Sequence, residues 1–294
     1  AIAITFNILA LYLIITRSRK EIGSYKYLLM TFLCTDSLFS LLHKLCQPVL
    51  SFRGGFFVSH CEGLIDSSFA LTLYGASGSL AFPLLAYHFL YRAFVVSSSF
   101  RLQPMRHGRL LAALFAVVLL IEAAVWIAFN YQLRLDPSDA AIREKILRTH
   151  ENLANRTELI VIVPFIDGEM NMKVARNAWP LLAIAISSFV IIVISAWRIT
   201  HVLYIHTSIS LPTIALQRRM FVALIVQMLV PTVTMFAPSL TAIALPFISS
   251  VSLDIPDWVI GSCYALHPIL DPIVITMCIR DYRIGLYELA GIYR

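Results

Sequence analysis

Three acidic side chains, Asp36, Glu122 and Asp271, lie inside long apolar stretches of this sequence. An ionisable group at membrane depth is costly, so each is a candidate functional group if these stretches cross a bilayer. Asn7 lies in a fourth stretch, and we expect Asn7, Asp36 and Asp271 to share a polar network. The alternative is that each bonds a nearby Ser, Thr or backbone group. Glu122 is expected to pair separately with a neighbouring helix.

One basic side chain, Arg92, ends a further apolar stretch. A lone Arg at such a boundary usually anchors a helix by extending its charged end to the membrane surface. Another stretch contains three prolines, Pro231, Pro238 and Pro246. Because proline removes backbone hydrogen bonds, we expect this helix to be kinked, so that one half can move relative to the other. Kinks also occur in helices that do not move.

Motifs of soluble enzymes and of metal sites are missing from the sequence. There is no Gly-rich phosphate loop, HExxH, GxSxG or CxxC. No two of the five cysteines have metal-ligand spacing; they are Cys34, Cys46, Cys61, Cys263 and Cys278. We therefore expect no catalytic residue, no metal and no cofactor. Cys46 and Cys263 are candidate disulfide partners for Cys61, and free thiols are the favoured alternative.

The composition indicates what kind of elements position these groups. The 294 residues are 59% apolar and 14% charged, with a mean hydropathy of +0.79. Soluble domains carry about a quarter charged residues, so this chain is expected to cross a membrane several times. Its apolar stretches exceed the roughly 10-residue strands of an outer-membrane barrel, which leaves an all-α bundle. The net charge of +6 lies mainly in loops beside the spans, so we expect no nucleic-acid binding.

Seven apolar runs of about 20 residues, bounded by charge, predict a seven-transmembrane helix bundle. The predicted spans are 1–16, 28–50, 64–91, 109–130, 179–203, 219–248 and 257–280. Residue 1 is not Met and already lies in an apolar run, so we expect the first span to be incomplete. Residues 281–294 are expected to form a short amphipathic helix after span seven.

The basic residues predict the orientation of the bundle. The loops after spans one, three and five and the C-terminal segment carry fourteen Lys and Arg residues against three acids, so this side is expected to be cytoplasmic. The long loop 131–178 carries seven basic and seven acidic residues, and it contains a glycosylation sequon at Asn155. We therefore expect the N-terminus and a glycosylated Asn155 outside the cell and the C-terminus inside.

The extracellular loop 131–178 carries structural signals of its own. Asp136-Pro137-Ser138-Asp139 is typical of a helix start and predicts a short amphipathic helix. The β-branched run from Leu159 to Ile166 precedes Asp167-Gly168, a two-residue hairpin signal, so a small β-ribbon is expected over the mouth of the bundle. An irregular glycosylated loop is an equal alternative.

Several sequence blocks occur in an order that is familiar from one family. They are Gly23–Leu28 before span two, His88–Arg92 after span three, Ala215–Gln217 leading into span six, Gln227–Pro231 and Ala237-Pro238 within it, His267–Pro272 in span seven, and Ile279–Arg283 after it. Together they resemble the nematode Str-type serpentine chemoreceptors over nearly the whole chain. The blocks in and after span seven are the most similar to that family's signature.

The resemblance implies a G-protein-coupled receptor in the plasma membrane of chemosensory neuron cilia, which detects a small odorant or other chemical cue. By likeness to rhodopsin-type receptors, Arg92 stands at the Arg of the D/E-R-Y motif, and Asp271-Pro272 at the Asn-Pro of NPxxY. Tyr91 replaces the acid of the first motif, Ile275 replaces the Tyr of the second, and span six lacks the usual Trp. Loop 131–178 has no cysteine, so the usual disulfide to this loop cannot form. These departures put the usual ionic lock and rotamer switch in doubt.

We expect a ligand in the outer half of the bundle to favour a packing in which span six opens at its cytoplasmic end. The groove between spans three, five and six would then receive a helix of the Gα subunit, the expected protein partner. The residues expected to act in coupling are Arg92, Tyr91, Arg218, Arg219, Asp271, Pro272 and Arg283. The residues expected to contact the ligand are Asp66, Phe69, Tyr74, Phe236, Tyr264 and His267, with lipid or core packing as the alternative for each aromatic residue.

Other classes of membrane protein predict other patterns. A seven-helix ligand-gated channel would carry a polar stripe through its full depth, and a transporter would show repeated halves. Neither pattern is present in the sequence, and a structural or trafficking protein without a ligand is a third alternative. Nucleotide exchange on a purified Gα would favour the receptor, whereas current that persists when G-protein signalling is blocked would favour the channel.

Overall fold

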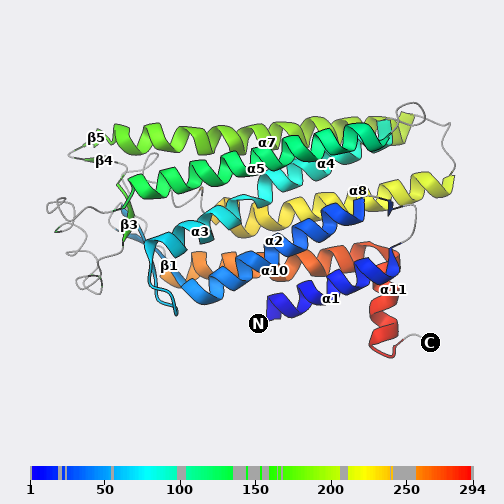
Figure 1. The fold of residues 1–294 in the computed structure, drawn as a ribbon, viewed down its shortest axis with the longest axis horizontal. Helices are drawn as coiled ribbons and strands as arrows, with labels where there is room; N and C mark the ends of the chain where they lie inside the picture. The colour runs from blue at the N-terminus through cyan, green and yellow to red at the C-terminus, as the bar shows by residue number, and fades with distance from the viewer. Residues whose placement is uncertain are drawn as a thin grey trace.

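A computed structural model shows a bundle of long helices with short strands gathered at one end (Figure 1). We call this end the sheet end. At the opposite end, which we call the α11 end, the short helix α11 (Arg280–Leu289) turns away from the bundle axis. The residues that the structure describes are 2–18, 22–23, 25–53, 56–97, 104–134, 144, 153, 159–163, 165–166, 168–205, 211–238, 240 and 256–292.

Within these residues, six helical spans are long and apolar enough to cross a membrane. In lipid a helix satisfies its backbone hydrogen bonds internally, which is why apolar runs of this length fold this way. The shorter apolar helix α1 packs against two of the spans, α2 and α10. The helices are α1 (Ile2–Arg17), α2 (Tyr25–Cys46), α3 (Ser68–Ser79), α4 (Ala81–Ser97), α5 (Pro104–Gln132), α7 (Met172–Ile205), α8 (Leu211–Pro231), η3 (Thr232–Phe236) and α10 (Asp257–Cys278).

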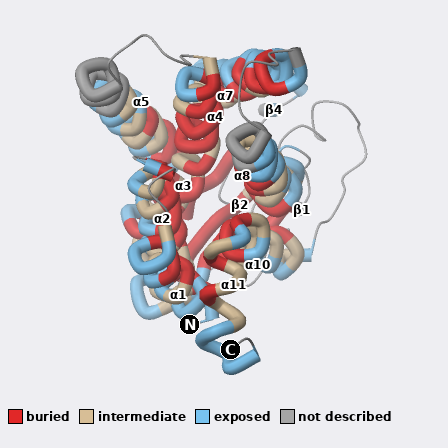
Figure 2. Tube along the Cα trace, turned by 90° about the vertical axis from the view of Figure 1, so that its right-hand side faces the viewer, coloured by how far each residue is buried: buried red, intermediate tan, exposed pale blue. Residues whose placement is uncertain are grey.

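Helix α7 carries a tryptophan near each end of its exposed apolar face. The side chains of Trp179 and Trp197 are 64% and 68% exposed. Eighteen residues of α-helix rise about 27 Å, close to the thickness of the hydrocarbon core of a bilayer. Tryptophan is enriched at membrane interfaces, so this spacing fits a helix that crosses one. Figure 2 shows buried residues facing the interior of the bundle and exposed residues facing outward.

Two of the spans are interrupted by proline. The span that was predicted as 64–91 consists of α3 and α4, which meet at Leu80. Pro83 has no N–H to donate to the Ser79 carbonyl, so the helical hydrogen-bond series is broken there. In span six, a π-helical turn, η3, follows directly after Pro231. The predicted kink is therefore a widened turn, and π-helical turns are frequent at functional sites.

The predicted span 28–50 is too long at its C-terminal end. Helix α2 ends at Cys46, and Pro48 begins strand β1 (Pro48–Arg53), which pairs antiparallel with β2 (Phe56–Cys61). A disulfide joins Cys46 to Cys61, so the expectation of free thiols was wrong for this pair, and Cys263 remains a free cysteine. The sequence missed the hairpin because its strands continue the apolar run of the helix.

Part of the loop 131–178 extends this hairpin into a three-stranded sheet. Strand β3 (Ile160–Ile162) pairs antiparallel with β2, with Val161 opposite Val58. Strands β4 (Phe165–Ile166) and β5 (Glu169–Met170) form a second, two-stranded hairpin that includes Gly168, whose φ is +85°. The predicted ribbon is confirmed for Phe165–Ile166, whereas Ile160–Ile162, the earlier part of the predicted run, pairs with β2 instead. The predicted helix start at Asp136–Asp139 and the sequon at Asn155 lie outside the described residues.

We expect the double variant Cys46→Ala/Cys61→Ala to lose about 3 kcal/mol of the free energy of unfolding, since the disulfide closes a loop of about 15 residues. Both sulfurs belong to a buried apolar cluster at the sheet end, and alanine avoids placing a hydroxyl there. Thermal unfolding of the purified protein in detergent would measure the loss. Cys263→Ala serves as the control and should unfold within about 0.5 kcal/mol of wild type.

Candidate functional site

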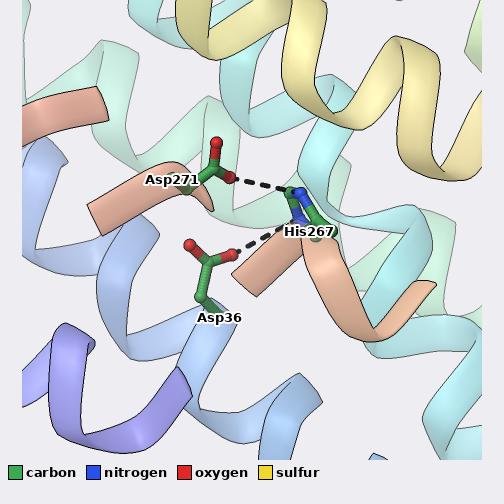
Figure 3. Close-up of side chains that lie close together, drawn as sticks. All are labelled: Asp36, His267 and Asp271. Carbon is green, nitrogen blue, oxygen red and sulfur yellow. Dashed lines mark ion pairs between the residues drawn. The ribbon is translucent and has the colours of Figure 1, made fainter. Parts of the chain in front are cut away.

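The centre of the bundle holds a buried polar trio of Asp36, His267 and Asp271 (Figure 3). His267 and Asp271 are four residues apart on α10 and therefore share one helix face. The Nδ1 atom of His267 lies 3.3 Å from Oδ2 of Asp271, and its Nε2 atom lies 3.5 Å from Oδ1 of Asp36 on α2. One imidazole thus faces two carboxyl groups and links span two to span seven.

This trio is rich in hydrogen-bond acceptors that have no donor. Among the described residues, Oδ2 of Asp36 and both carboxyl oxygens of Asp271 have no hydrogen-bond partner. The three side chains each offer a ligand atom, and these atoms lie within 4.8 Å of one another, so the trio can hold a cation. The sequence predicted no metal site, because local spacing could not show that residues of spans two and seven meet.

Asn7, which was predicted to share a polar network with Asp36 and Asp271, bonds backbone carbonyls instead. The Nδ2 atom of Asn7 donates to the carbonyls of Ala3 and Pro268, each at 2.9 Å. Pro272 prevents the usual helical bond to the Pro268 carbonyl, which leaves that oxygen available to Asn7. His267, which the sequence placed only among the ligand contacts, lies between the two carboxyl groups. The three predicted residues therefore converge on one segment of α10.

An aromatic group, which we call the Tyr74 cluster, adjoins the trio; its members are Phe39, His43, Tyr74, Tyr264 and His267. The Tyr74 hydroxyl lies 3.0 Å from Nδ1 of His43, and its ring stacks on Phe39 with centroids 4.8 Å apart. The Tyr264 ring is 6.5 Å from that of Tyr74, and Phe39 meets His267 edge-on at 6.1 Å. Three of the predicted ligand residues, Tyr74, Tyr264 and His267, are thus brought together.

The other predicted ligand residues lie apart from this cluster. Phe236 packs against Phe82 and Phe189, with ring centroids 5.4 and 5.2 Å away, where spans three, five and six meet. Phe69 is 61% exposed, and Asp66 is also exposed. The structure therefore divides the predicted set into an interior cluster, a second aromatic contact and two surface residues.

At the α11 end, Arg92 is buried although it ends its span. Its Nη1 atom donates to Oε1 of Gln217 on α8 at 3.0 Å, and its guanidinium lies 4.3 Å from the ring centre of Tyr25 on α2. Tyr91 stacks on the same Tyr25 ring, with centroids 6.2 Å apart. The snorkelling anchor that the sequence offered as an alternative does not describe this side chain, which is only 5% exposed.

The remaining residues predicted to act in coupling surround this end of the bundle. Arg218 donates to the Leu203 carbonyl at 3.3 Å, and Arg219 is exposed. Arg283, on α11, donates to the Met277 carbonyl at 3.0 Å, while Pro272 is buried within α10.

Helix α11 is held to α1 by polar contacts at both of its ends. The Tyr282 hydroxyl lies 2.8 Å from that of Ser18, and Glu288 forms an ion pair with Arg17 at 2.6 Å. Burial raises the pKa of the Tyr282 phenol, which therefore remains a neutral partner of Ser18. The position of α11 against the bundle thus depends on Arg17, the last residue of α1, and on Ser18, which follows it.

Glu122 pairs separately, as predicted. It is buried on α5 and hydrogen-bonds with Ser79, the last residue of α3. This contact places a carboxyl group next to the break in span three.

Sequence reasoning assigned no role of their own to three residues of these sites: Tyr25, Phe39 and Gln217. Tyr25 and Gln217 lie within blocks that carried the family resemblance, so those blocks were a usable signal. Phe39 and His43 lie three and seven residues after Asp36, on one helical face, which also could have indicated their shared position. Contacts between helices, however, are not encoded in the spacing of either helix.

Comparison with known proteins identifies the family of this chain. The family model described as serpentine type 7TM GPCR chemoreceptor Str matches residues 1–287. Serpentine receptor class r-10 of Caenorhabditis elegans is 27% identical, with 98% of this chain and 88% of the relative covered. The C. elegans G-protein coupled receptor str-33 is 24% identical, with 98% and 87% covered. The chain therefore belongs to the Str family of serpentine seven-transmembrane chemoreceptors, which are G-protein-coupled receptors in the membrane.

Proposed function

We propose that this chain is an olfactory-type receptor that binds a small environmental chemical at the sheet end and activates a heterotrimeric G protein at the α11 end. In this proposal the sheet end faces outward and the α11 end faces the cytoplasm of a chemosensory cilium. Asn155 would then be available for glycosylation. The observation that carries the proposal is the continuous set of buried polar and aromatic groups, from Tyr74 through the trio, in a chain of this family.

The Tyr74 cluster is the proposed ligand site. Its aromatic faces suit small, weakly polar molecules, and the His43–Tyr74 pair and His267 offer polar groups that can fix a ligand's orientation. The cluster draws on spans two, three and seven, and it contacts the trio through His267. A ligand that binds one packing of these side chains better than another shifts the equilibrium between them.

The proposed output is movement of span six away from span three. In the structure the Arg92–Gln217 hydrogen bond joins these spans at the α11 end. Separation would open a groove bordered by Arg92, Arg218 and Arg219, where a C-terminal helix of Gα can dock. The widened turn η3, at the level of the Phe236 contacts, supplies the point at which span six can bend.

An odorant panel on cells that express the full-length receptor tests this proposal. We expect Tyr264→Ala to change which odorants evoke a response, because it reshapes the Tyr74 cluster. Arg92→Ala should abolish the G-protein response to every odorant at normal surface expression. Val222→Ala, at an exposed apolar position of α8, is the matched control and should respond like wild type. A current that persists when G-protein signalling is blocked would instead support a channel.

A further inference from the structure

No negative charge from the described part of the chain pairs with the guanidinium of Arg92. Among the residues that the structure describes, Arg92 makes no ion pair with a carboxylate; it contacts the neutral amide of Gln217, the ring face of Tyr25 and, through a side-chain hydrogen bond, the Tyr25 hydroxyl. The position before it, where an acid would be expected in a rhodopsin-type motif, is Tyr91. A buried cation must nevertheless be compensated, and an amide oxygen and an aromatic face both provide partial negative charge.

The two contacts reach Arg92 from different spans. Gln217 lies on α8, near the end of span six that is proposed to move, whereas Tyr25 begins α2. Tyr25 is itself fixed: it is buried, its hydroxyl lies 3.5 Å from Nδ1 of His88, and its ring packs against Tyr91. Movement of span six would therefore break the bond to Gln217 and leave Arg92 against Tyr25.

We propose that Gln217 and Tyr25 form a charge-neutral latch on Arg92 that keeps the cytoplasmic ends of spans three and six together in the inactive receptor. This inference rests on the proposed function for its biological meaning, but the latch is a physical property of the chain alone. When the latch opens, the hydrogen bond between Arg92 and Gln217 breaks. The contact with Tyr25 persists and keeps Arg92 within reach of Gln217. A neutral latch is weaker than an ion pair, so the resting state is held less firmly than a carboxylate would hold it.

Two substitutions at Gln217 should act in opposite directions. Gln217→Ala removes the acceptor, and loss of a hydrogen bond to a charged group should raise the open population about tenfold. Gln217→Glu turns the contact into an ion pair and should lower that population below wild type. Tyr25→Leu removes both the ring face and the hydroxyl and should act like Gln217→Ala. Tyr25→Phe keeps the face and loses only the hydroxyl's hydrogen bond with Arg92, so it should fall between Tyr25→Leu and wild type. Val222→Ala is the control.

The first experiment measures the distance between two helices at the α11 end without a G protein. Spin labels at Thr16→Cys and Ala215→Cys, two exposed positions at the α11 ends of α1 and α8, report the distance between these helices in nanodiscs. Cys34, Cys263 and Cys278 are replaced by alanine in this background so that the labels react only at the chosen positions. We expect a longer-distance population that grows in Gln217→Ala and Tyr25→Leu and shrinks in Gln217→Glu. Unchanged distances across the three variants would overturn the latch.

Basal nucleotide exchange on purified Gα, without ligand, is measured on the same variants. We expect Gln217→Ala to raise the basal rate about tenfold and Gln217→Glu to lower it. If the distances shift as predicted but no variant stimulates any Gα, the latch stands and the proposed G-protein function fails. If both glutamine variants change the distance and the basal rate in the same direction, the latch is wrong.

Discussion

His267→Ala is expected to cost about 2–3 kcal/mol of the free energy of unfolding, because it removes the polar group that faces both buried carboxyls of the trio. Asp36 and Asp271 would then border a buried cavity and lose the side chain that lies within 3.5 Å of both of them. The loss would appear as a lower unfolding temperature of the receptor in lipid nanodiscs and as reduced surface expression in cells.

Two further variants separate this explanation from simple loss of volume. His201→Ala removes an exposed histidine of α7 and should change the free energy of unfolding by less than about 0.5 kcal/mol. His267→Ala/Asp271→Asn should be more stable than His267→Ala, because the double variant no longer buries two unpaired carboxyl groups together. If the double variant is the less stable of the two, the interaction between the imidazole and the carboxyls does not stabilise the bundle.

The helical spans could be predicted from the sequence because lipid imposes a length and a polarity on each of them. Runs of apolar residues fixed the positions of α2, α7 and α10 to within a few residues, apart from the early end of α2 at Cys46 and the earlier start of α7 at Met172. The break in span three was not predicted, since Pro83 and its apolar neighbours form one continuous apolar run in the sequence, which predicted a single helix. Prolines in such runs are compatible with both a kinked and a broken helix.

The candidate site was predicted only in part, and the reason is the same for each omission. Because burying a carboxyl group in a membrane is costly, Asp36 and Asp271 could be identified from the sequence as residues that need a partner. The sequence could not show which helices pack together. His267 was therefore placed in the ligand site and not between the two carboxyls. Gln217 was read as part of a family block with no role of its own, because its partner Arg92 lies 125 residues earlier in the chain.

Gly63→Ala is expected to destabilise the receptor by about 3 kcal/mol, because the added methyl group would overlap the backbone at the end of α2. A Cβ at this position would lie 2.7 Å from the carbonyl carbon of Cys46 and 2.8 Å from that of Leu45. These are backbone atoms, which cannot rotate away as a side chain can. The Gly63 N–H also donates to the Cys46 carbonyl at 2.9 Å, so displacement of the loop would break that bond next to the disulfide.

Gly261→Ala provides a matched control with the opposite expected sign. Gly261 lies within α10, and the nearest atom to its added Cβ would be the Pro48 carbonyl oxygen at 3.8 Å, an ordinary contact. Alanine in a helix interior should therefore stabilise the receptor by about 0.5–1 kcal/mol. Unfolding temperatures of both variants and wild type, measured under the same conditions, would show whether the two glycines differ as the geometry requires. Equal destabilisation by both substitutions would mean that the close approach of Gly63 to α2 is not what restricts that position to glycine.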